Sequence, residues 1–402
     1  MGLNFDQTIP QLDVVAHRLG GSVVDHQAQV DSFINSATSL TQPEIIEKLG
    51  NVKERPFMAA IIHDTLIGNY APPSPPTDWS VVSVDGSHID IDRHLPLPCY
   101  LINLGGCVLT YGDSSDAEFF SESKLGATQT DLYLSDPDSA NQEEPITGPL
   151  LGTIRTIQEL KMLAKVVQEC PPELPVLALV DGTLVLWGLS GQGYRPFVRR
   201  ELLQNGLFPA LESLRILSET RAISLAAYVS LPRTTEVTNT MRASLCPHPV
   251  WLCQSKCNHN RSIQSPCDIS NNILDREVFS NLLREGERSS IYRTDPQAAQ
   301  EYYGEHQVYF YYLNSGEEIA RIEIPGWVAK DERLLSLGHS LIMEQCKKGN
   351  GYPVAITEAH EQAVINGADR YLFKEMVNQA LERQGINTYT SQKDRSKRMP
   401  WL

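Results

Sequence analysis

Apolar positions along the chain follow two periods, which predicts a protein that combines strands and helices. Residues 81–112 interleave β-branched and polar residues, a pattern typical of two or three antiparallel strands. Residues 174–182 and 223–232 are short continuous apolar runs, as in strands buried on both faces. In residues 151–170 the apolar positions recur at helical spacing. This order of elements favours an α/β fold, a mixed sheet flanked by helices.

Further elements and the segment limits follow from the same pattern. Helices are expected at 198–219, 234–244, 271–285, 331–347 and 357–384, and strands at 308–313 and 318–325. The expected organisation is a helical N-terminal arm at 1–70, a Pro-rich spacer at 71–80, a main domain at 81–390 with a cysteine-containing insertion at 246–270, and a basic tail at 391–402. Residues 113–148 are acidic, Ser-rich and weakly periodic, so we expect an exposed excursion there.

The charge of the chain limits its function. Its 402 residues include 34 Lys and Arg against 49 Asp and Glu, a formal net charge of −15. This acidity argues against a protein that wraps nucleic acid by neutralising many phosphates, but it suits an enzyme whose acidic residues bind metal ions. The sequence has no apolar run long enough for a membrane span and no apolar core of an export signal near its start, so we expect a cytoplasmic protein.

The sequence contains one internal echo, Val-Asp-Gly-Ser at 84–87 and Val-Asp-Gly-Thr at 180–183. In each copy we expect an apolar strand to end at the aspartate and the glycine to allow a tight turn. If the two strands are neighbours, Asp85 and Asp181 converge at one end of the sheet and hold a divalent cation; carboxylate oxygens suit Mg²⁺ or Mn²⁺. The alternative is that each Asp-Gly pair forms an ordinary turn.

Three further residues have both a structural and a chemical interpretation. Glu159, one turn after Arg155, forms either an exposed ion pair or a third carboxylate over the sheet end. His360 is expected on the packed side of a helix that opens near Thr357, either as a core residue or as a ligand that favours Mn²⁺ over Mg²⁺. Tyr352, in a Gly-Tyr-Pro turn, either packs or presents its phenol to a phosphate.

Cysteines are concentrated in one segment. Of the 8 in the chain, four fall within residues 246–267. Only Cys253 and Cys257 have the tight spacing that metal sites favour. The segment is therefore either a loop with small buried side chains or a structural site for zinc or an iron–sulfur cluster, with the ligands Cys246, Cys253, Cys257 and Cys267.

Five segments in a fixed order resemble a known family. They are Asp85-Gly86-Ser87, the helix with Arg155 and Glu159, Asp181-Gly182-Thr183-Leu184, Arg321-Ile-Glu323-Ile-Pro325, and Tyr352 with Ala359-His360. Together, over about residues 80–372, they look like the NurA family of nucleases, which partner the HerA hexameric translocase in DNA end resection.

The resemblance implies a fold, an activity and a set of site residues. The implied fold has an RNase H-like core. The implied activity is that of a Mn²⁺-dependent (or Mg²⁺-dependent) deoxyribonuclease, both an exonuclease and an endonuclease, that acts in DNA repair. The resemblance also implies a homodimer that works with a HerA-type ATPase and does not bind a membrane. By the same resemblance, the metal ligands are Asp85, Glu159, Asp181 and His360, and Tyr352 is an active-site residue.

Two other functions stay open at this point. An ATP-binding phosphotransferase of the actin-like group also uses strand-ending Asp-Gly-Ser/Thr turns, although the sequence has no convincing Gly-rich adenosine motif between residues 330 and 360. A catalytically inactive adaptor is less attractive, because all the candidate ligands are present.

Overall fold

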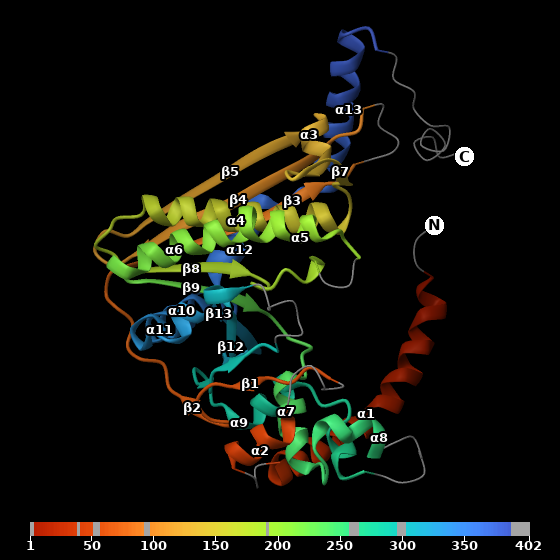
Figure 1. The fold of residues 1–402 in the computed structure, drawn as a ribbon, viewed down its shortest axis with the longest axis vertical. Coiled ribbons are helices and arrows are strands. Elements are labelled where there is room, and N and C mark those ends of the chain that lie inside the picture. The colour runs from red at the N-terminus through yellow and green to blue at the C-terminus, as the bar shows by residue number, and fades with distance from the viewer. Residues whose placement is uncertain are drawn as a thin grey trace. The chain divides into compact units, whose positions relative to one another are not determined.

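The computed structural model describes residues 4–37, 41–50, 57–91, 97–189, 193–256, 265–295 and 303–386. The chain divides into two compact units, which we describe separately (Figure 1). The first unit comprises Met1–Ala71, Ser230–Glu301 and Tyr309–Arg321. The second comprises Pro72–Val229, Tyr302–Val308 and Ile322–Leu402.

Five strands of the second unit form a mixed sheet. They are β3 (Trp79–Ile89), β4 (Tyr100–Tyr111), β5 (Asp116–Gly126), β8 (Val176–Asp181) and β9 (Ile223–Val229). β3, β4 and β5 form an antiparallel meander, β8 runs parallel to β3, and β9 runs parallel to β8. The spatial order β5-β4-β3-β8-β9 with these directions is that of an RNase H-like core, as expected.

The helices of the second unit are α3 (Gln129–Leu132), α4 (Pro149–Glu169), α5 (Pro196–Leu202), α6 (Phe208–Thr220), α10 (Gly326–Ala329), α11 (Glu332–Lys348), α12 (Val354–Ala363) and α13 (Gly367–Arg383). A π-helical turn, Leu203–Leu207, joins α5 to α6, and a small hairpin consists of β6 (Tyr133–Asp136) and β7 (Ser139–Pro145). No helix among the described residues combines the length and the apolar character that crossing a membrane requires.

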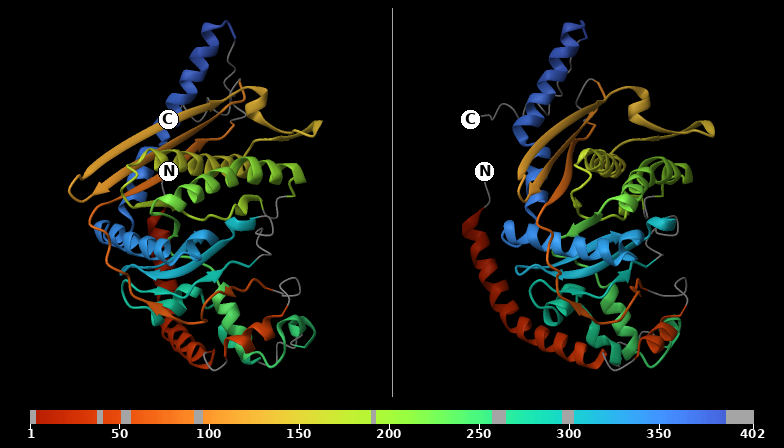
Figure 2. Two further views of the ribbon diagram at one scale, coloured as in Figure 1. Left: turned by 60° about the vertical axis from the view of Figure 1, so that its left-hand side comes forward. Right: turned by 90° about the vertical axis from the view of Figure 1, so that its left-hand side faces the viewer.

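Helices cover both faces of the sheet in the second unit (Figure 2). Successive residues of a strand point to opposite faces, and Asp85 of β3 pairs with Gly105 of β4. A Cβ atom on Gly105 would meet the backbone of Ala363 in α12, whereas a Cβ atom on the next residue of β3, Gly86, would meet Glu159 of α4. The strand β3 therefore lies between α4 and α12, the two helices that carry candidate site residues.

The core of the second unit explains the continuous apolar runs. Val176, Leu177, Ala178 and Leu179 of β8 are completely buried, and so is most of β9. Helices α4 and α6 pack on these central strands, as does α11. Both faces of β8 and β9 are thus covered, so neither strand needs alternating polar residues.

The first unit joins N-terminal helices to short strands. Its helices are α1 (Phe5–Ala37), α2 (Gln42–Leu49), α7 (Glu236–Leu245), α8 (Cys253–Lys256) and α9 (Asp275–Leu282). Its strands are β1 (Ile61–Ile62), β2 (Asn69–Tyr70), β10 (Arg288–Ser289), β11 (Tyr292–Arg293), most of β12 (Val308–Asn314) and the first half of β13 (Ile319–Pro325). Its core contains Phe33, Ile45, Phe279, Phe310 and Tyr312.

The two structural units have other boundaries than the segments expected from sequence. Residues 1–71 pack with 230–301, so the cysteine segment 246–270 belongs to the same unit as the N-terminal helices. Residues 113–148, expected as an exposed excursion, contain β5, which is exposed along most of its length, and the β6–β7 hairpin. Because β5 is an edge strand exposed along most of its length, it has little apolar alternation to reveal it. The basic tail expected at 391–402 lies outside the described residues.

Candidate active site

The structure brings Asp85 and Asp181 to the same level of two adjacent strands. The parallel register of β3 and β8 runs as far as the pair Ser83 and Leu179. Each aspartate lies two residues beyond its member of that pair. The convergence expected from the two Asp-Gly copies is therefore present.

The two copies nevertheless differ in backbone structure. β8 ends at Asp181, and Gly182 has a φ of +91°, a conformation that favours glycine. β3, in contrast, does not end at Asp85, because it continues to Ile89 and pairs with β4 along its whole length. The expectation of a turn at Asp85-Gly86 was wrong. Gly86 provides space, since a Cβ atom there would lie 2.5 Å from Oε1 of Glu159.

Glu159 is the third acidic residue at this position and is buried on α4. Its Oε1 lies 3.0 Å from Nε of Arg155, so the ion pair exists, but with a buried carboxylate instead of an exposed one. The two atoms are close but poorly aligned, and neither has a hydrogen-bond partner among the described residues. Burial, together with the negative charges of Asp85 and Asp181, raises the pKa of Glu159 to about 8, although Arg155 opposes the shift.

His360 contacts Asp85 from α12. Its Nδ1 lies 2.8 Å from Oδ2 of Asp85. The expectation that the imidazole faces the packed side of the helix was wrong: the side chain is 58% exposed, and Ala359 and Ala363 fill the packed side. The end of α12 is fixed to the sheet, because Ser87 Oγ donates a hydrogen bond of 2.5 Å to the Ala363 carbonyl. This anchor keeps His360 beside Asp85.

Tyr352 contacts Asp181. Its hydroxyl donates to Oδ1 of Asp181 at 3.3 Å, and its ring packs edge-on against Tyr228, with centroids 5.3 Å apart. Burial and the charge of Asp85 raise the pKa of Asp181, while the Tyr352 hydrogen bond, His360 and the Gly182 N–H oppose the rise. The side chain of Asp181 therefore has partners, but they do not balance its burial and the neighbouring charge.

Glu323 of β13 was given no role from sequence, yet it supports the turn after Asp181. Its Oε2 accepts hydrogen bonds from Thr183 Oγ1 at 2.7 Å and from Leu184 N at 3.0 Å. The side chain is buried. The available signal was an acidic residue within the apolar strand Ile319–Pro325, which is costly without a specific partner.

Asp85, Glu159 and Asp181 line one pocket of about 380 Å³, together with Arg155, Thr183 and Trp187. The hydrogen-bonding deficit at Glu159 Oε1 and the repulsion among the three carboxylates fit a divalent cation, for which carboxylate oxygens are suitable ligands. In the described part of the chain, however, no group of three or more His, Cys, Asp or Glu side chains is close enough together to hold a metal ion. The three acids share a pocket without closing around a common point.

The described residues of the cysteine segment form no group that could hold a metal ion. Cys246 and Cys267 are buried and Cys253 is half-buried, whereas Cys257 lies outside the described residues. Cys267 Sγ lies 3.9 Å from Nη2 of Arg242. A zinc or iron–sulfur site at these cysteines stays a prediction.

Comparison with known proteins identifies the family. The sequence model of the NurA domain matches residues 80–365. No curated protein matches the chain significantly. Among solved structures, one of NurA bound to dAMP and manganese has 13% identity and a TM-score of 0.39, covering 96% of this chain and 99% of that chain. One of NurA with manganese has 11% identity and a TM-score of 0.37, covering 92% of this chain and 99% of that chain. The domain match extends over more than half of the sequence, and the chain belongs to the NurA family of nucleases.

Proposed function

We propose that the protein is a metal-dependent nuclease that hydrolyses phosphodiester bonds in DNA. The observation that carries this proposal is the meeting of Asp85, Glu159 and Asp181, from two strands and a helix, in one pocket where burial and mutual repulsion raise carboxyl pKa values. Such clustering is costly to folding and is typical of functional sites. Membership of the NurA family supports the same activity.

The residues of the pocket have separate roles in this proposal. Asp85, Glu159, Asp181 and His360 would hold Mn²⁺, or Mg²⁺. A bound divalent cation lowers the pKa of a water molecule and neutralises the charge that develops on the phosphate. Tyr352 orients the Asp181 carboxylate through its hydroxyl. The Asp85 contact fixes Nδ1 of the His360 ring, so that Nε2 is the nitrogen that can bind the ion or move a proton.

Assembly with other molecules belongs to the same proposal. The substrate is DNA, and the partner is a HerA-type hexameric ATPase that feeds DNA to a homodimer of this chain during end processing in the cytoplasm. The net charge of −15 supports a need for such a partner, because the chain is poorly suited to hold DNA by charge alone.

A paired assay tests the activity. Labelled single-stranded and double-stranded DNA, incubated with the purified protein, should be degraded with Mn²⁺ and remain intact with EDTA. ATP hydrolysis is measured on the same preparation. Degradation without ATP hydrolysis supports the nuclease, ATP hydrolysis alone supports a phosphotransferase, and the absence of both activities supports an inactive adaptor.

The cysteine segment is tested independently. We propose a structural zinc or iron–sulfur site at Cys246, Cys253, Cys257 and Cys267. Elemental analysis of the purified protein should then find zinc or iron bound stoichiometrically. Protein that contains neither element overturns this part of the proposal without affecting the nuclease.

A further inference from the structure

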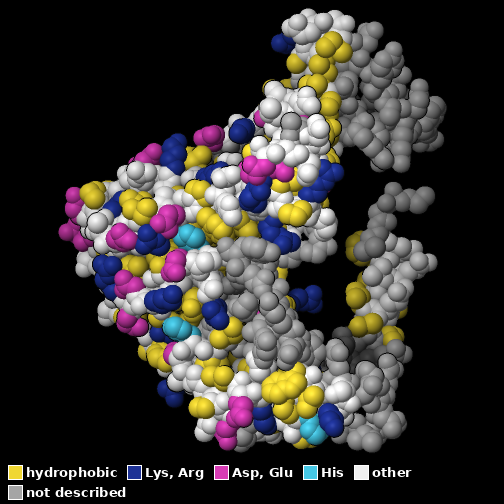
Figure 3. Space-filling view, viewed as in Figure 1, with side chains coloured by type: hydrophobic (Ala, Val, Ile, Leu, Met, Phe, Trp, Pro, Cys, Tyr) yellow, Lys and Arg dark blue, Asp and Glu magenta, His cyan; other side chains and the backbone are white. Residues whose placement is uncertain are grey.

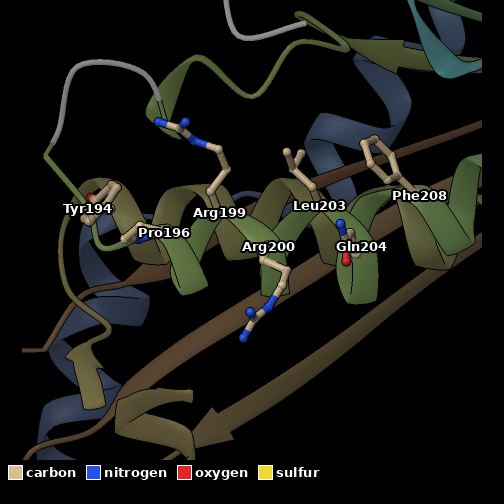
Figure 4. A pocket seen from close by; sticks show the side chains of 7 residues that line it. All are labelled: Tyr194, Pro196, Arg199, Arg200, Leu203, Gln204 and Phe208. Carbon is tan, nitrogen blue, oxygen red and sulfur yellow. The ribbon is translucent and has the colours of Figure 1, made fainter. Parts of the chain in front are cut away.

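A second pocket lies beside α5, about 390 Å³ in volume, and the function proposed above makes no use of it (Figure 4). We call it the α5 pocket; it is lined by Tyr194, Pro196, Arg199, Arg200, Leu203, Gln204 and Phe208. Aromatic side chains, Tyr194 and Phe208, mark its two ends, with arginines between them (Figure 4). This volume is in the usual range for small-molecule sites.

The helix geometry at the α5 pocket is unusual. The turn Leu203–Leu207 is π-helical, a rare element that occurs frequently at functional sites. The wider π turn brings residues five apart to the same side of a helix, and Figure 4 shows Leu203 and Phe208 projecting from the same side as Arg199. In a regular α-helix Phe208 would point elsewhere. The irregular turn therefore adds an aromatic ring to the pocket.

The local charge differs from that of the whole chain. Arg195, Arg199 and Arg200 fall within one short segment of a protein whose net charge is −15. Figure 3 shows Lys and Arg side chains grouped on the surface over α5. Arg200 pairs with Asp136 at 2.7 Å, Asp138 at 2.9 Å and Glu201 at 3.9 Å, and Nη2 of Arg199 donates to the carbonyl of Leu189 at 3.5 Å. Both arginines line the pocket, and a guanidinium group is suited to a phosphate.

A continuous segment links the α5 pocket to the carboxylates. After Asp181, Val185, Leu186 and Trp187 line the carboxylate pocket. Leu189, two residues beyond Trp187, supplies the carbonyl that Arg199 contacts. The short helix Trp187–Leu189 thus lines the carboxylate pocket through Trp187 and contacts an arginine of the α5 pocket through Leu189.

From these observations we propose that the α5 pocket binds one nucleotide of the DNA strand whose scissile phosphate lies at the carboxylates. The base stacks on Tyr194, and Arg199 holds the phosphate. Phe208, whose ring already stacks on His306, forms the apolar far end of the pocket. Aromatic rings and arginines are the groups that bind single-stranded nucleic acid without sequence preference. This inference rests on the proposed nuclease function, which it deepens by giving the substrate strand a second contact.

Binding without cleavage tests the α5 pocket. A short fluorescent oligothymidylate is titrated in EDTA against the wild-type protein and the variants Tyr194→Ala and Arg199→Gln. Each variant should bind about 10-fold more weakly, the size expected for the loss of one stacked base or phosphate contact. Tyr194→Trp, which keeps a stacking surface, should bind like the wild type. The matched control is Arg215→Gln on α6, since Arg215 pairs with Glu212 and Glu219 outside the pocket.

A minimal substrate separates this inference from the nuclease itself. The p-nitrophenyl ester of thymidine 5′-monophosphate is short enough to occupy the carboxylate pocket alone, so Tyr194→Ala and Arg199→Gln should reduce Mn²⁺-dependent cleavage of oligothymidylate more than hydrolysis of this ester. Oligothymidylate affinity equal to that of the wild type in both variants, or no binding by the wild type, overturns the inference. If the two variants bind free dAMP more weakly but bind oligothymidylate like the wild type, the pocket takes a free nucleotide and not a nucleotide of the strand, which also overturns the inference. A wild-type protein that hydrolyses no phosphodiester overturns the nuclease, while the binding titration still decides on the α5 pocket.

Discussion

Each unit contains a group of carboxylates with a buried glutamate, Glu236 in the first unit and Glu159 in the second, and the two groups differ in how their oxygens are satisfied. In the first unit, Asp275 accepts hydrogen bonds from the backbone of Val237 and Thr238 and from the Tyr312 hydroxyl. Glu236 pairs with Arg321 at 2.7 Å. In the second unit, Glu159 Oε1 has no hydrogen bond among the described residues, although its carboxylate is equally buried.

Under the proposed function, this difference separates carboxylates that stabilise the fold from carboxylates that bind a metal ion. Hydrogen bonds and the Arg321 ion pair give the oxygens of Asp275 and Glu236 partners within the protein, although burial still raises the pKa of Glu236. Asp85, Glu159 and Asp181 repel one another, and Arg155 compensates them only in part. Glu236 and Glu159 are both buried, and their hydrogen bonds distinguish the two sites.

The largest expected effect is at the aspartates of the second unit. Asp85→Ala and Asp181→Ala should each abolish Mn²⁺-dependent DNA cleavage, because loss of a shared carboxylate removes the ion itself. Thermal unfolding with and without Mn²⁺ gives a second readout: Mn²⁺ should raise the Tm of the wild type and not that of either variant. Asp116→Asn, on the exposed edge strand, is the control. Near-normal cleavage by either alanine variant would show that the carboxylates were assigned to the wrong reaction.

The next largest effect is on the stability of the first unit, when Arg321, the partner of the buried Glu236, is removed. Arg321→Ala should lower the free energy of unfolding by about 3–5 kcal/mol, because Glu236 is left buried and unpaired. Urea unfolding measures this value. The double variant Arg321→Met/Glu236→Leu should recover most of the loss. Arg155→Met should cost much less, since the Arg155 side chain is 31% exposed, compared with 2% for Arg321, and makes no aligned hydrogen bond to Glu159. Equal losses at the two arginines would contradict the comparison.

The pH dependence of stability should distinguish Glu159 from an ordinary surface acid. Its pKa rises from 4.5 in the unfolded chain to about 8 in the folded, metal-free protein. The folded state therefore binds more protons between these values, and the free energy of unfolding falls as pH rises through this window, by about 1.4 kcal/mol for each unit of pKa difference.

Glu159→Gln should remove this pH dependence, and Mn²⁺ should weaken it in the wild type because a cation favours the ionised carboxylate. Unfolding curves at several pH values check both statements. A wild-type protein whose stability is flat or rises from pH 5 to 8 would exclude the raised pKa.

A smaller effect is expected at Glu323, a positioning residue. Glu323→Gln should lower kcat about 10-fold and weaken Mn²⁺ binding, because the turn after Asp181 loses a charged acceptor. The matched control is Glu318→Gln: Glu318 Oε2 accepts from Ser230 Oγ at 2.7 Å and Leu231 N at 3.2 Å, the same contacts at a turn without a candidate ligand. If both variants lose only stability and keep kcat and Mn²⁺ affinity, Glu323 is structural.

The smallest effects are expected at the glycines of the two Asp-Gly copies, Gly86 and Gly182. Gly182→Ala should cost about 1–2 kcal/mol of stability, because its φ of +91° disfavours any side chain with a Cβ atom. Gly86→Ala should instead weaken Mn²⁺ binding severalfold, since the new methyl group would displace Glu159. Calorimetric titration with Mn²⁺ and thermal unfolding measure both. The same response from both variants would remove the distinction between the two Asp-Gly copies.

The sequence predicted the parts of this molecule in which pattern and burial agree. Strands β8 and β9 were evident because they are apolar throughout, and the repeat of Asp-Gly predicted that Asp85 and Asp181 converge. The orientation of His360 was wrong, because three small alanines of α12 fill the packed side and leave the larger ring exposed. Glu323 received no role, since its hydrogen bonds reach Thr183 and Leu184, more than a hundred positions earlier in the chain.

The pocket beside α5 was also invisible in the sequence. Its aromatic end depends on a π-helical turn that changes the side on which Phe208 projects. A helical pattern read with a constant period cannot show such a change.

The order in which the site residues occur along the chain has a consequence for synthesis. Ribosomes release the chain from its N-terminus, and Asp85, Glu159 and Asp181 emerge well before Tyr352 and His360. The helix that brings His360 to Asp85 follows all three acids in the chain. A nascent chain would therefore possess the acids before the imidazole, and under the proposed function full activity would begin only after His360 has been added and α12 has folded onto the sheet.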